Sequence, residues 1–298
     1  MDILDRNTTH VCTFKPSLTI PVDGHEATCS CFSEDGSWLA VSHTSGIVQE
    51  GYSPCAGRVR WLQPRPCPLL VAAFDFTMGA SQPARQRACA RAYVGGHIHH
   101  WHATSGKLIS TIQEPGNEIF SLVHQETGVL FATAGLDTKV RIYDGLTRKM
   151  SMVLDEGDGS STSGHTNRVF ALKWNSLDTN VLMSGGWDKT IQLWDLRVGK
   201  SVRSIYGPYI CGASLDFDMN TKRILTGSWR AVEQLQEWDY GSGSLIRTFM
   251  WPQSMNWEKV AGSLDQLDKG VVSISFNISG TRICVVTSNQ LFVVSLKE

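Results

Sequence analysis

The side-chain types of a hydrolytic triad occur within one short stretch of this chain. His165, Ser184 and Asp188 supply an imidazole, a hydroxyl and a carboxylate, the groups that together activate a serine nucleophile. Each lies beside an apolar, strand-like run, and Trp194 follows with an indole N–H. Buried groups of these kinds each need a hydrogen-bond partner, and a closed network supplies them. We therefore interpret the four residues as a structural tetrad rather than as a catalytic site.

The sequence has one histidine cluster that could bind a metal ion: His97, His99, His100 and His102. On a strand, His100 and His102 share one face, while His97 and His99 share the other. At most two ligands therefore converge, whereas zinc takes three or four. We predict no metal and no cofactor, and stoichiometric zinc, copper or nickel in the purified protein would contradict this.

Other catalytic motifs are missing from the sequence. The run from Gly212 to Asp216, GASLD, begins like a nucleophile elbow around Ser214 but ends in an acid where the elbow has a glycine. It also opens a predicted strand instead of a strand-to-helix turn. There is no P-loop, no G-x-G-x-x-G after a strand and no H-E-x-x-H. We predict that the protein is not an enzyme.

The elements that carry the tetrad are three short runs that alternate in and out as strands do. They are VFALKWN (169–175), NVLMSGGWD (180–188) and TIQLWDLR (190–197), with turn residues between them. Gly164-His165 opens the unit, and Trp194-Asp195 closes its third run. The unit resembles a WD repeat, the four-stranded blade of a β-propeller. The resemblance implies that Asp188 accepts a hydrogen bond from His165, that His165 engages Ser184, and that Ser184 engages the indole of Trp194.

The pattern recurs along the chain. The residues equivalent to Trp174 in the first strand of each unit are Phe32, Phe76, His124, Phe217 and Phe276. Repeats of this kind run about 40–45 residues, and no interval here holds two of them. The sequence predicts an all-β fold in which residues 1–298 form one WD-repeat β-propeller domain. We expect six blades, with seven as the alternative.

The two ends of the chain complement each other. An apolar run at 10–22 precedes the first Gly-His, and the last unit ends after its third strand at 290–298. Residues 1–22 are therefore predicted to supply the outer strand of the last blade and to close the ring. Pro16 and Pro21 agree, because proline is confined to edge strands or strand ends. In the first blade, residues 59–61 are predicted as the third strand.

Composition and charge exclude several classes of function. The chain carries 27 Lys and Arg against 28 Asp and Glu, a net charge of −1, so no global field attracts nucleic acid or a membrane. Its 8 Cys include no C-x-x-C pair, which suits a reducing compartment. No secretory h-region is present, and no apolar run approaches the roughly 18 residues of a membrane span. We expect a cytoplasmic or nuclear protein without membrane association.

One sector departs from this neutrality. Between Arg58 and Arg91 the chain has six arginines and a single acid, Asp75. Such a sector could contact nucleic acid or an acidic partner. It has no interleaved aromatic residues of the kind on which single strands stack. We interpret it as solvated loops and keep nucleic-acid binding as a weaker alternative.

The resemblance also implies where a partner would bind. In WD-repeat propellers, the loops between second and third strands and between successive blades crowd one face, the top face. The residue before the turn Asp is Leu136, Trp187 and Trp229 in blades three, four and five, and Arg230 replaces the acid in blade five. We predict an apolar strip with a guanidinium fork that anchors a peptide or loop of a partner. Alternatively, each indole folds onto its own blade or the next.

A second motif lies on the opposite face. Residues 194–197 read Trp-Asp-Leu-Arg, which resembles the W-D-x-R box of propellers that dock the adaptor of cullin-RING ubiquitin ligases. Arg197 would then contact the adaptor; alternatively it packs or pairs at the strand end. We predict a non-enzymatic protein-interaction scaffold, a monomer within a larger complex, with a ubiquitin-ligase substrate receptor as the alternative.

Overall fold

The structure is a computed structural model that describes β-strands between His10 and Ser295 and the turns between many of them. It describes side chains at 95–100, 108–125, 127–155, 157, 162–230, 233–249, 271–276 and 283–285. Within the described residues, no helix is long and apolar enough to span a membrane.

The described strands pair into six sheets, numbered here in chain order. The first sheet is β3 (Ala27–Phe32), β4 (Trp38–His43), β5 (Val48–Tyr52) and β6 (Val59–Leu62). The second sheet is β7 (Val71–Thr77), β8 (Ala88–Tyr93), β9 (His97–His102) and β10 (Leu108–Gln113). The third sheet is β11 (Ile119–His124), β12 (Leu130–Gly135), β13 (Val140–Asp144) and β14 (Met150–Leu154).

The remaining sheets follow the same order, and two of them include N-terminal strands. The fourth sheet is β15 (Val169–Trp174), β16 (Val181–Gly186), β17 (Thr190–Asp195) and β18 (Lys200–Tyr206). The fifth sheet is β19 (Leu215–Asp218), β20 (Arg223–Gly227), β21 (Leu235–Asp239), β22 (Leu245–Met250) and β1 (His10–Thr13). The sixth sheet is β23 (Val271–Phe276), β24 (Arg282–Thr287), β25 (Gln290–Ser295) and β2 (Pro16–Pro21).

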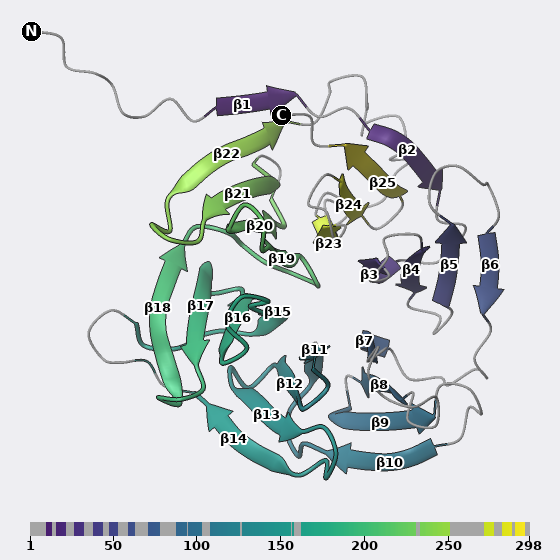
Figure 1. Ribbon diagram of the computed structural model, residues 1–298, viewed down its shortest axis with the longest axis vertical. Coiled ribbons are helices and arrows are strands. Elements are labelled where there is room, and N and C mark those ends of the chain that lie inside the picture. The colour runs from purple at the N-terminus through teal and green to yellow at the C-terminus, as the bar shows by residue number, and fades with distance from the viewer. Residues whose placement is uncertain are drawn as a thin grey trace, which may run out of the picture.

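The sheets lie side by side around a central axis, with β3, β7, β11, β15, β19 and β23 nearest to it (Figure 1). Each of these inner strands contacts the next, and β23 contacts β3. Because the strands of a sheet are antiparallel, the turn between its second and third strands lies at the same end as the connection to the next sheet. We call that end the top face and the opposite end the bottom face.

The predicted all-β fold of four-stranded antiparallel sheets is confirmed. The prediction that residues 59–61 form the third strand of the first sheet is wrong, because they belong to β6, its fourth strand. The third strand is β5, whose sequence VQEGY contains Glu50 and Gly51. That strand lacks the apolar alternation that makes a strand recognisable.

The N-terminal segment pairs with two sheets. β2 runs antiparallel to β25, with Thr19 opposite Phe292 in the middle of the register. This is the pairing that the closure prediction requires. β1 runs parallel to β22 as a fifth strand of the neighbouring sheet, a pairing that the sequence did not predict. The segment therefore joins the fifth sheet to the sixth.

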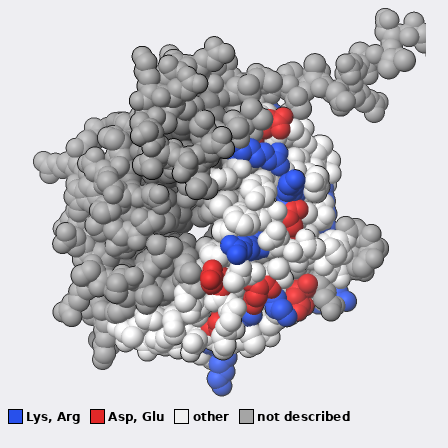
Figure 2. All heavy atoms as spheres, turned by 180° about the vertical axis from the view of Figure 1, so that it is seen from behind, with Lys and Arg blue, Asp and Glu red and all other residues white. Residues whose placement is uncertain are grey.

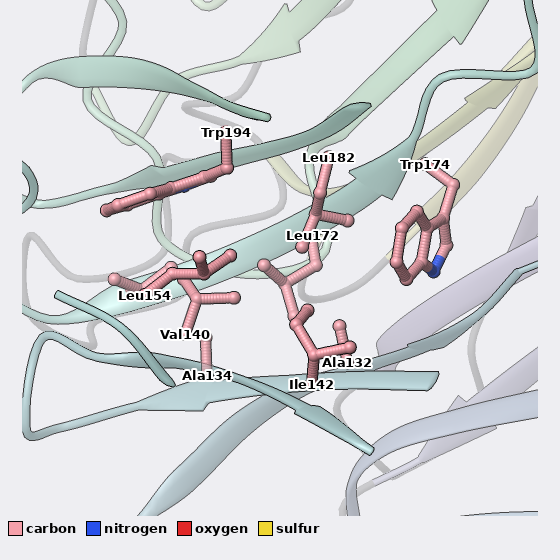
Figure 3. Packing of buried hydrophobic residues seen from close by; sticks show 10 residues of the cluster. Ala132, Ala134, Val140, Ile142, Leu154, Leu172, Trp174, Leu182 and Trp194 are labelled. Carbon is pink, nitrogen blue, oxygen red and sulfur yellow. The ribbon is translucent and has the colours of Figure 1, made fainter. Parts of the chain in front are cut away.

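The hydrophobic core lies between neighbouring sheets rather than inside any one of them. Figure 3 shows side chains of the third sheet, such as Ile142, facing Leu172, Leu182 and Trp194 of the fourth. Similar clusters join the second sheet to the third, the fourth to the fifth and the fifth to the sixth. Leu182 and Trp194 are fully buried in this way, so each sheet depends on its neighbours for stability.

Five of the six inner strands, all except β19, share an irregularity at the top face. The register of β11 shifts between Ile119 and Ser121, and that of β15 shifts between Val169 and Ala171. β3, β7 and β23 shift at the same point, after their first residue. A bulge of this kind re-aims one side chain. In β11 and β15 the bulged residues are Phe120 and Phe170, both half-buried.

Candidate functional site on the top face

The three turn residues predicted to form the apolar strip are held in equivalent ways. The backbone N–H of Leu136 donates to the carbonyl of Glu118, at 2.9 Å. In the same way, the backbone N–H of Trp187 donates to the carbonyl of Arg168 at 3.0 Å, and that of Trp229 donates to the carbonyl of Tyr209 at 2.8 Å. Arg168 directly precedes β15, and Tyr209 lies in the connection that leads to β19. All three side chains are half-buried. The turns are thus fixed at the top face beside the starts of the inner strands.

Trp187 belongs to a series of four aromatic rings that runs from the third sheet across the fourth to the connection into the fifth. Phe120 and Phe170 stack with ring centroids 4.6 Å apart and planes 11° apart. Phe170 contacts the indole of Trp187 at 5.1 Å, and Trp187 stacks on Tyr209 at 6.0 Å with planes 13° apart. We call these four residues the aromatic ladder. Its two phenylalanines are the bulged residues of β11 and β15, and Tyr209 precedes β19.

Two further groups surround the indole of Trp187. The guanidinium carbon of Arg168 lies 5.2 Å from its ring centroid, within the range of a cation–π interaction. Burial raises the pKa of the Cys211 thiol, and the nearby Trp187 indole offsets part of that rise. The alternative in which the indole folds onto its own sheet and the next therefore describes its contacts well. The packing also fixes the ring in one orientation while leaving it partly exposed.

Arg230 is less available than the sequence suggested. Its Nη2 donates to the backbone carbonyl of Gly207, and its Nη1 lies 4.0 Å from a carboxylate oxygen of Glu233. The guanidinium was expected to offer its N–H donors to a partner, but it is engaged within the chain. It braces the connection that leads into the fifth sheet.

The tetrad of the fourth sheet has the three hydrogen bonds that the resemblance implied. His165 Nδ1 lies 2.7 Å from Asp188 Oδ2, and His165 Nε2 lies 2.6 Å from Ser184 Oγ. The Trp194 indole donates to Ser184 Oγ at 2.6 Å. Burial alone would raise the pKa of Asp188, but the hydrogen bond and charge of His165 bring it below the ordinary value. The Ser184 hydroxyl is fully buried and engaged on both sides, which suits structure rather than nucleophilic attack.

The third sheet replaces the missing histidine with a buried carboxylate. Glu114, only 3 % exposed, accepts hydrogen bonds from Thr133 at 2.5 Å and from the Tyr143 hydroxyl at 2.8 Å. Its other oxygen accepts from Asn117 at 2.6 Å and lies 3.3 Å from Arg141. Burial and the neighbouring Glu114 raise the pKa of Tyr143 well above its usual value. Glu114 therefore does in this sheet what His165 does in the next.

A carboxylate near the central axis links three sheets. Asp216 of β19 is 4 % exposed and forms an ion pair with Lys173 of β15 at 2.6 Å. Its other oxygen accepts the backbone N–H of Phe276 in β23. Ser214, the serine of the elbow-like run, is fully buried and donates to the carbonyl of Gly227 at 2.9 Å. Both residues thus have structural partners.

Arg197 lies on the bottom face at the end of β17. Its Nη2 lies 2.8 Å from Asp195 and 3.0 Å from Asp178, while its side chain remains 57 % exposed. The neighbouring Val198 is 61 % exposed and Leu177 is 52 % exposed. The guanidinium is thus held in place at a strand end yet remains accessible, with apolar side chains next to it.

The histidine cluster separates into buried and half-buried members. His100 is 3 % exposed, with Nδ1 3.3 Å from Ser110 Oγ and its ring 5.1 Å from Phe131. His97 and His99 are half-buried, with ring centroids 6.2 Å apart. The described side chains include no group of three or more His, Cys, Asp or Glu that could hold a metal ion. The side chains of His102 and of the sector from Arg58 to Arg91 lie outside the described residues.

Sequence reasoning missed most of the aromatic ladder. Phe120 and Phe170 carried a usable signal, since each is a large aromatic residue at the second position of an inner strand, in IFSLVH and VFALKW. Tyr209 and Glu114 lie in connections between sheets, where no periodicity marks them. Their roles depend on contacts between segments far apart in sequence.

Comparisons with known proteins agree with the fold. The family model described as "WD domain, G-beta repeat" matches residues 106–144 and 159–195. The predicted resemblance to WD repeats is therefore confirmed for these two stretches. The chain is also similar to a chain in a crystal structure of the mitotic checkpoint complex. That match has a TM-score of 0.63 and 19 % identity and covers 93 % of this chain and 76 % of the other, which shows the fold alone.

Curated relatives match over part of their length. A U3 small nucleolar RNA-associated protein 21 homolog of Schizosaccharomyces pombe is 32 % identical over 71 % of this chain and 21 % of its own length. A guanine nucleotide-binding protein subunit beta of Oryza sativa is 31 % identical over 44 % of this chain and 32 % of its own. A CCR4-associated factor 4 homolog of Candida glabrata is 28 % identical over 51 % and 27 %. The matches thus span between a fifth and a third of these relatives.

Proposed function

We propose that this chain is a non-enzymatic scaffold that binds a peptide or loop of a partner protein on its top face. The observation that carries the proposal is the aromatic ladder, with Trp187 held by Phe170 and Tyr209 and still partly exposed. Trp and Tyr are enriched among the residues that dominate interfaces. A ring already fixed in one orientation loses little entropy when a partner binds. Leu136 and Trp229 extend the apolar surface into the neighbouring sheets.

The charges favour a protein partner over nucleic acid. Lys, Arg, Asp and Glu side chains are interspersed over the described part of the face in Figure 2. The chain as a whole carries a net charge of −1. Nucleic-acid binding rests on phosphate contacts and typically shows as a basic patch. WD40 proteins are generally non-enzymatic scaffolds, and we expect this one to work in the cytoplasm or nucleus as a monomer within a larger complex.

Capture from cell lysate followed by mass spectrometry tests the proposal. Trp187→Ala and Trp229→Ala should each weaken the interaction with the captured partner by about 30-fold or more, as truncation of a Trp anchor costs about 2–4 kcal/mol. Because Trp187 also packs on two rings, its truncation will lower stability, so Trp187→Phe is needed as the variant that preserves stacking. Tyr206→Ala is the matched control, since Tyr206 lies 69 % exposed on the outer strand β18. Unchanged binding by both Trp variants would place the partner elsewhere.

A second candidate function is a substrate receptor of a cullin-RING ubiquitin ligase. It is favoured by Arg197, which closes the W-D-x-R sequence and is exposed on the bottom face beside Val198 and Leu177. An accessible guanidinium flanked by apolar side chains is suited to an adaptor surface. The two candidates use opposite faces, so they can be separated experimentally.

A further inference from the structure

The outer edge of the fifth sheet holds a strand that is not part of the four-stranded repeat. β1 pairs in parallel with β22, with Cα partners from His10–Arg247 to Thr13–Met250. The other pairs of this sheet, β19–β20, β20–β21 and β21–β22, are all antiparallel. β1 is therefore an addition to a sheet that is already complete.

The described side chains of β22 are engaged by the sheet's own strands and by the sixth sheet. Arg247 donates to Glu237 of β21, and Thr248 lies 3.5 Å from the amide of Gln236. Phe249, 5 % exposed, belongs to the core cluster between the fifth and sixth sheets. Release of β1 would thus leave this core in place and expose the backbone N–H and C=O groups of an edge strand.

β1 is also tethered closely to a better-held strand. Two residues separate it from β2, which has five Cα partners in β25 against the four that β1 has in β22. A short tether keeps β1 at high local concentration near β22. A four-residue parallel ladder is slightly less stable per residue than an antiparallel one. β1 can therefore open while β2 stays paired.

In the fourth sheet, the neighbouring outer edge also pairs with a residue from outside the four-stranded repeat. Gly157, in the connection between β14 and β15, forms an isolated parallel bridge with Ser201 of β18. Thr162 Oγ1 lies 3.1 Å from Ser201 Oγ and so fixes the same connection to the outer strand. A Cβ on Gly157 would lie 1.9 Å from the carbonyl oxygen of Thr162, so only glycine fits this approach.

We propose that the outer edge of β22 is a strand-addition site for an extended segment of a partner protein, which pairs in parallel with residues 247–250 in competition with β1. Strand addition takes its affinity from main-chain hydrogen bonds. The segment therefore needs about four consecutive residues without proline and with β-forming side chains, as in the resident sequence HVCT. This site lies on the rim and is separate from the top-face ladder.

A synthetic peptide with the sequence of residues 7–14, labelled with fluorescein, is the probe. It is titrated by fluorescence anisotropy into the full chain, into Val11→Pro/Cys12→Pro and into the matched control Val11→Ala/Cys12→Ala. Neighbouring amides of a strand point in opposite directions, so one of the two N–H groups at positions 11 and 12 faces β22. The proline pair removes that donor, whereas the alanine pair keeps both N–H groups. The proline variant should bind the peptide at least ten-fold more tightly, because its own strand no longer competes. Peptide N-methylated at both amides should not bind.

Equal binding by the proline and alanine variants, with circular dichroism matching wild type, would overturn the proposal. Hydrogen exchange on the unaltered chain gives a second readout that needs no variant. Amides of β1 should exchange at least 100-fold faster than those of β2, and equal protection would show that β1 does not open. A wild-type dimer that the peptide dissociates would assign the edge to a second copy instead of a partner. Trp187→Ala should leave peptide binding unchanged, so failure of this site is distinct from failure of the top-face site.

Discussion

Asp188 is the residue on which the tetrad of the fourth sheet depends. One carboxylate oxygen accepts from His165 and the backbone of Thr166, and the other accepts from the backbone and hydroxyl of Thr190. Asp188→Ala leaves the buried imidazole without its acceptor, which should cost about 1–3 kcal/mol of stability. Thermal melting measures the loss. Asp155→Ala, which removes an exposed ion pair with Lys139, is the control and should change stability little.

His100 should make stability depend on pH. Burial, followed by the positive charges of His124, Arg148 and His99, lowers the pKa of His100 to about 3. In the unfolded chain the pKa is about 6.5, so between these values the unfolded state binds the additional proton. The stabilising effect of a neutral His100 is complete above pH 6.5 and is lost as the pH falls toward 3.

Urea unfolding between pH 7.5 and 4.5 tests this. Each pH unit below about 6 should cost wild type up to roughly 1.4 kcal/mol through this group. His100→Gln cannot take up the proton and should show a shallower slope. His97→Gln, on the half-buried side of the same strand, serves as the control. Parallel slopes for wild type and His100→Gln would contradict the assignment.

Among the elements, β2 is the one whose loss should matter most. Deletion of residues 1–22 removes the strand that pairs with β25 and exposes a sheet edge, which promotes aggregation. Deletion of residues 1–14 removes only β1 and leaves β2 in place. Light scattering and thermal melting should show more aggregation and a lower Tm for the longer deletion than for the shorter one, which exposes only the edge of β22. If both truncated proteins are monomeric and melt as wild type does, the ring is held closed in another way.

A strand could be predicted from the sequence where its residues followed the repeat pattern closely. The fourth sheet could be read almost residue by residue, because its strands alternate and Gly164-His165 and Trp194-Asp195 mark its limits. β5 could not, because Glu50 and Gly51 break its alternation. The pairing of β1 with β22 joins segments more than 200 residues apart, and no local signal encodes it. Of the four residues of the aromatic ladder only Trp187 was predicted, because it occupies a repeat position, whereas Tyr209 lies in a connection between sheets.

At the scale of the whole molecule, the two faces should act independently. Trp229 lies at the top of the fifth sheet and Arg197 at the bottom of the fourth, with complete strands between them. Arg197→Ala should abolish co-precipitation of the cullin-ligase adaptor and leave the top-face partner bound. Trp229→Ala should do the reverse. Immunoblots of both proteins in the same pull-down measure the two effects, and absence of the adaptor from the wild-type sample would remove the ligase candidate.

The pairing of β2 with β25 also has a consequence for biosynthesis. A ribosome makes residues 16–21 long before residues 290–295. β2 therefore has no partner while the strands that lie between it and β25 in the sequence are translated. At about 5–20 residues per second that delay is roughly 15–50 s. Limited proteolysis of ribosome-stalled chains should cut near β2 until β25 has emerged. Throughout this interval the segment that forms β2 has no partner strand, so the risk of aggregation lies at the start of the nascent chain rather than at its end.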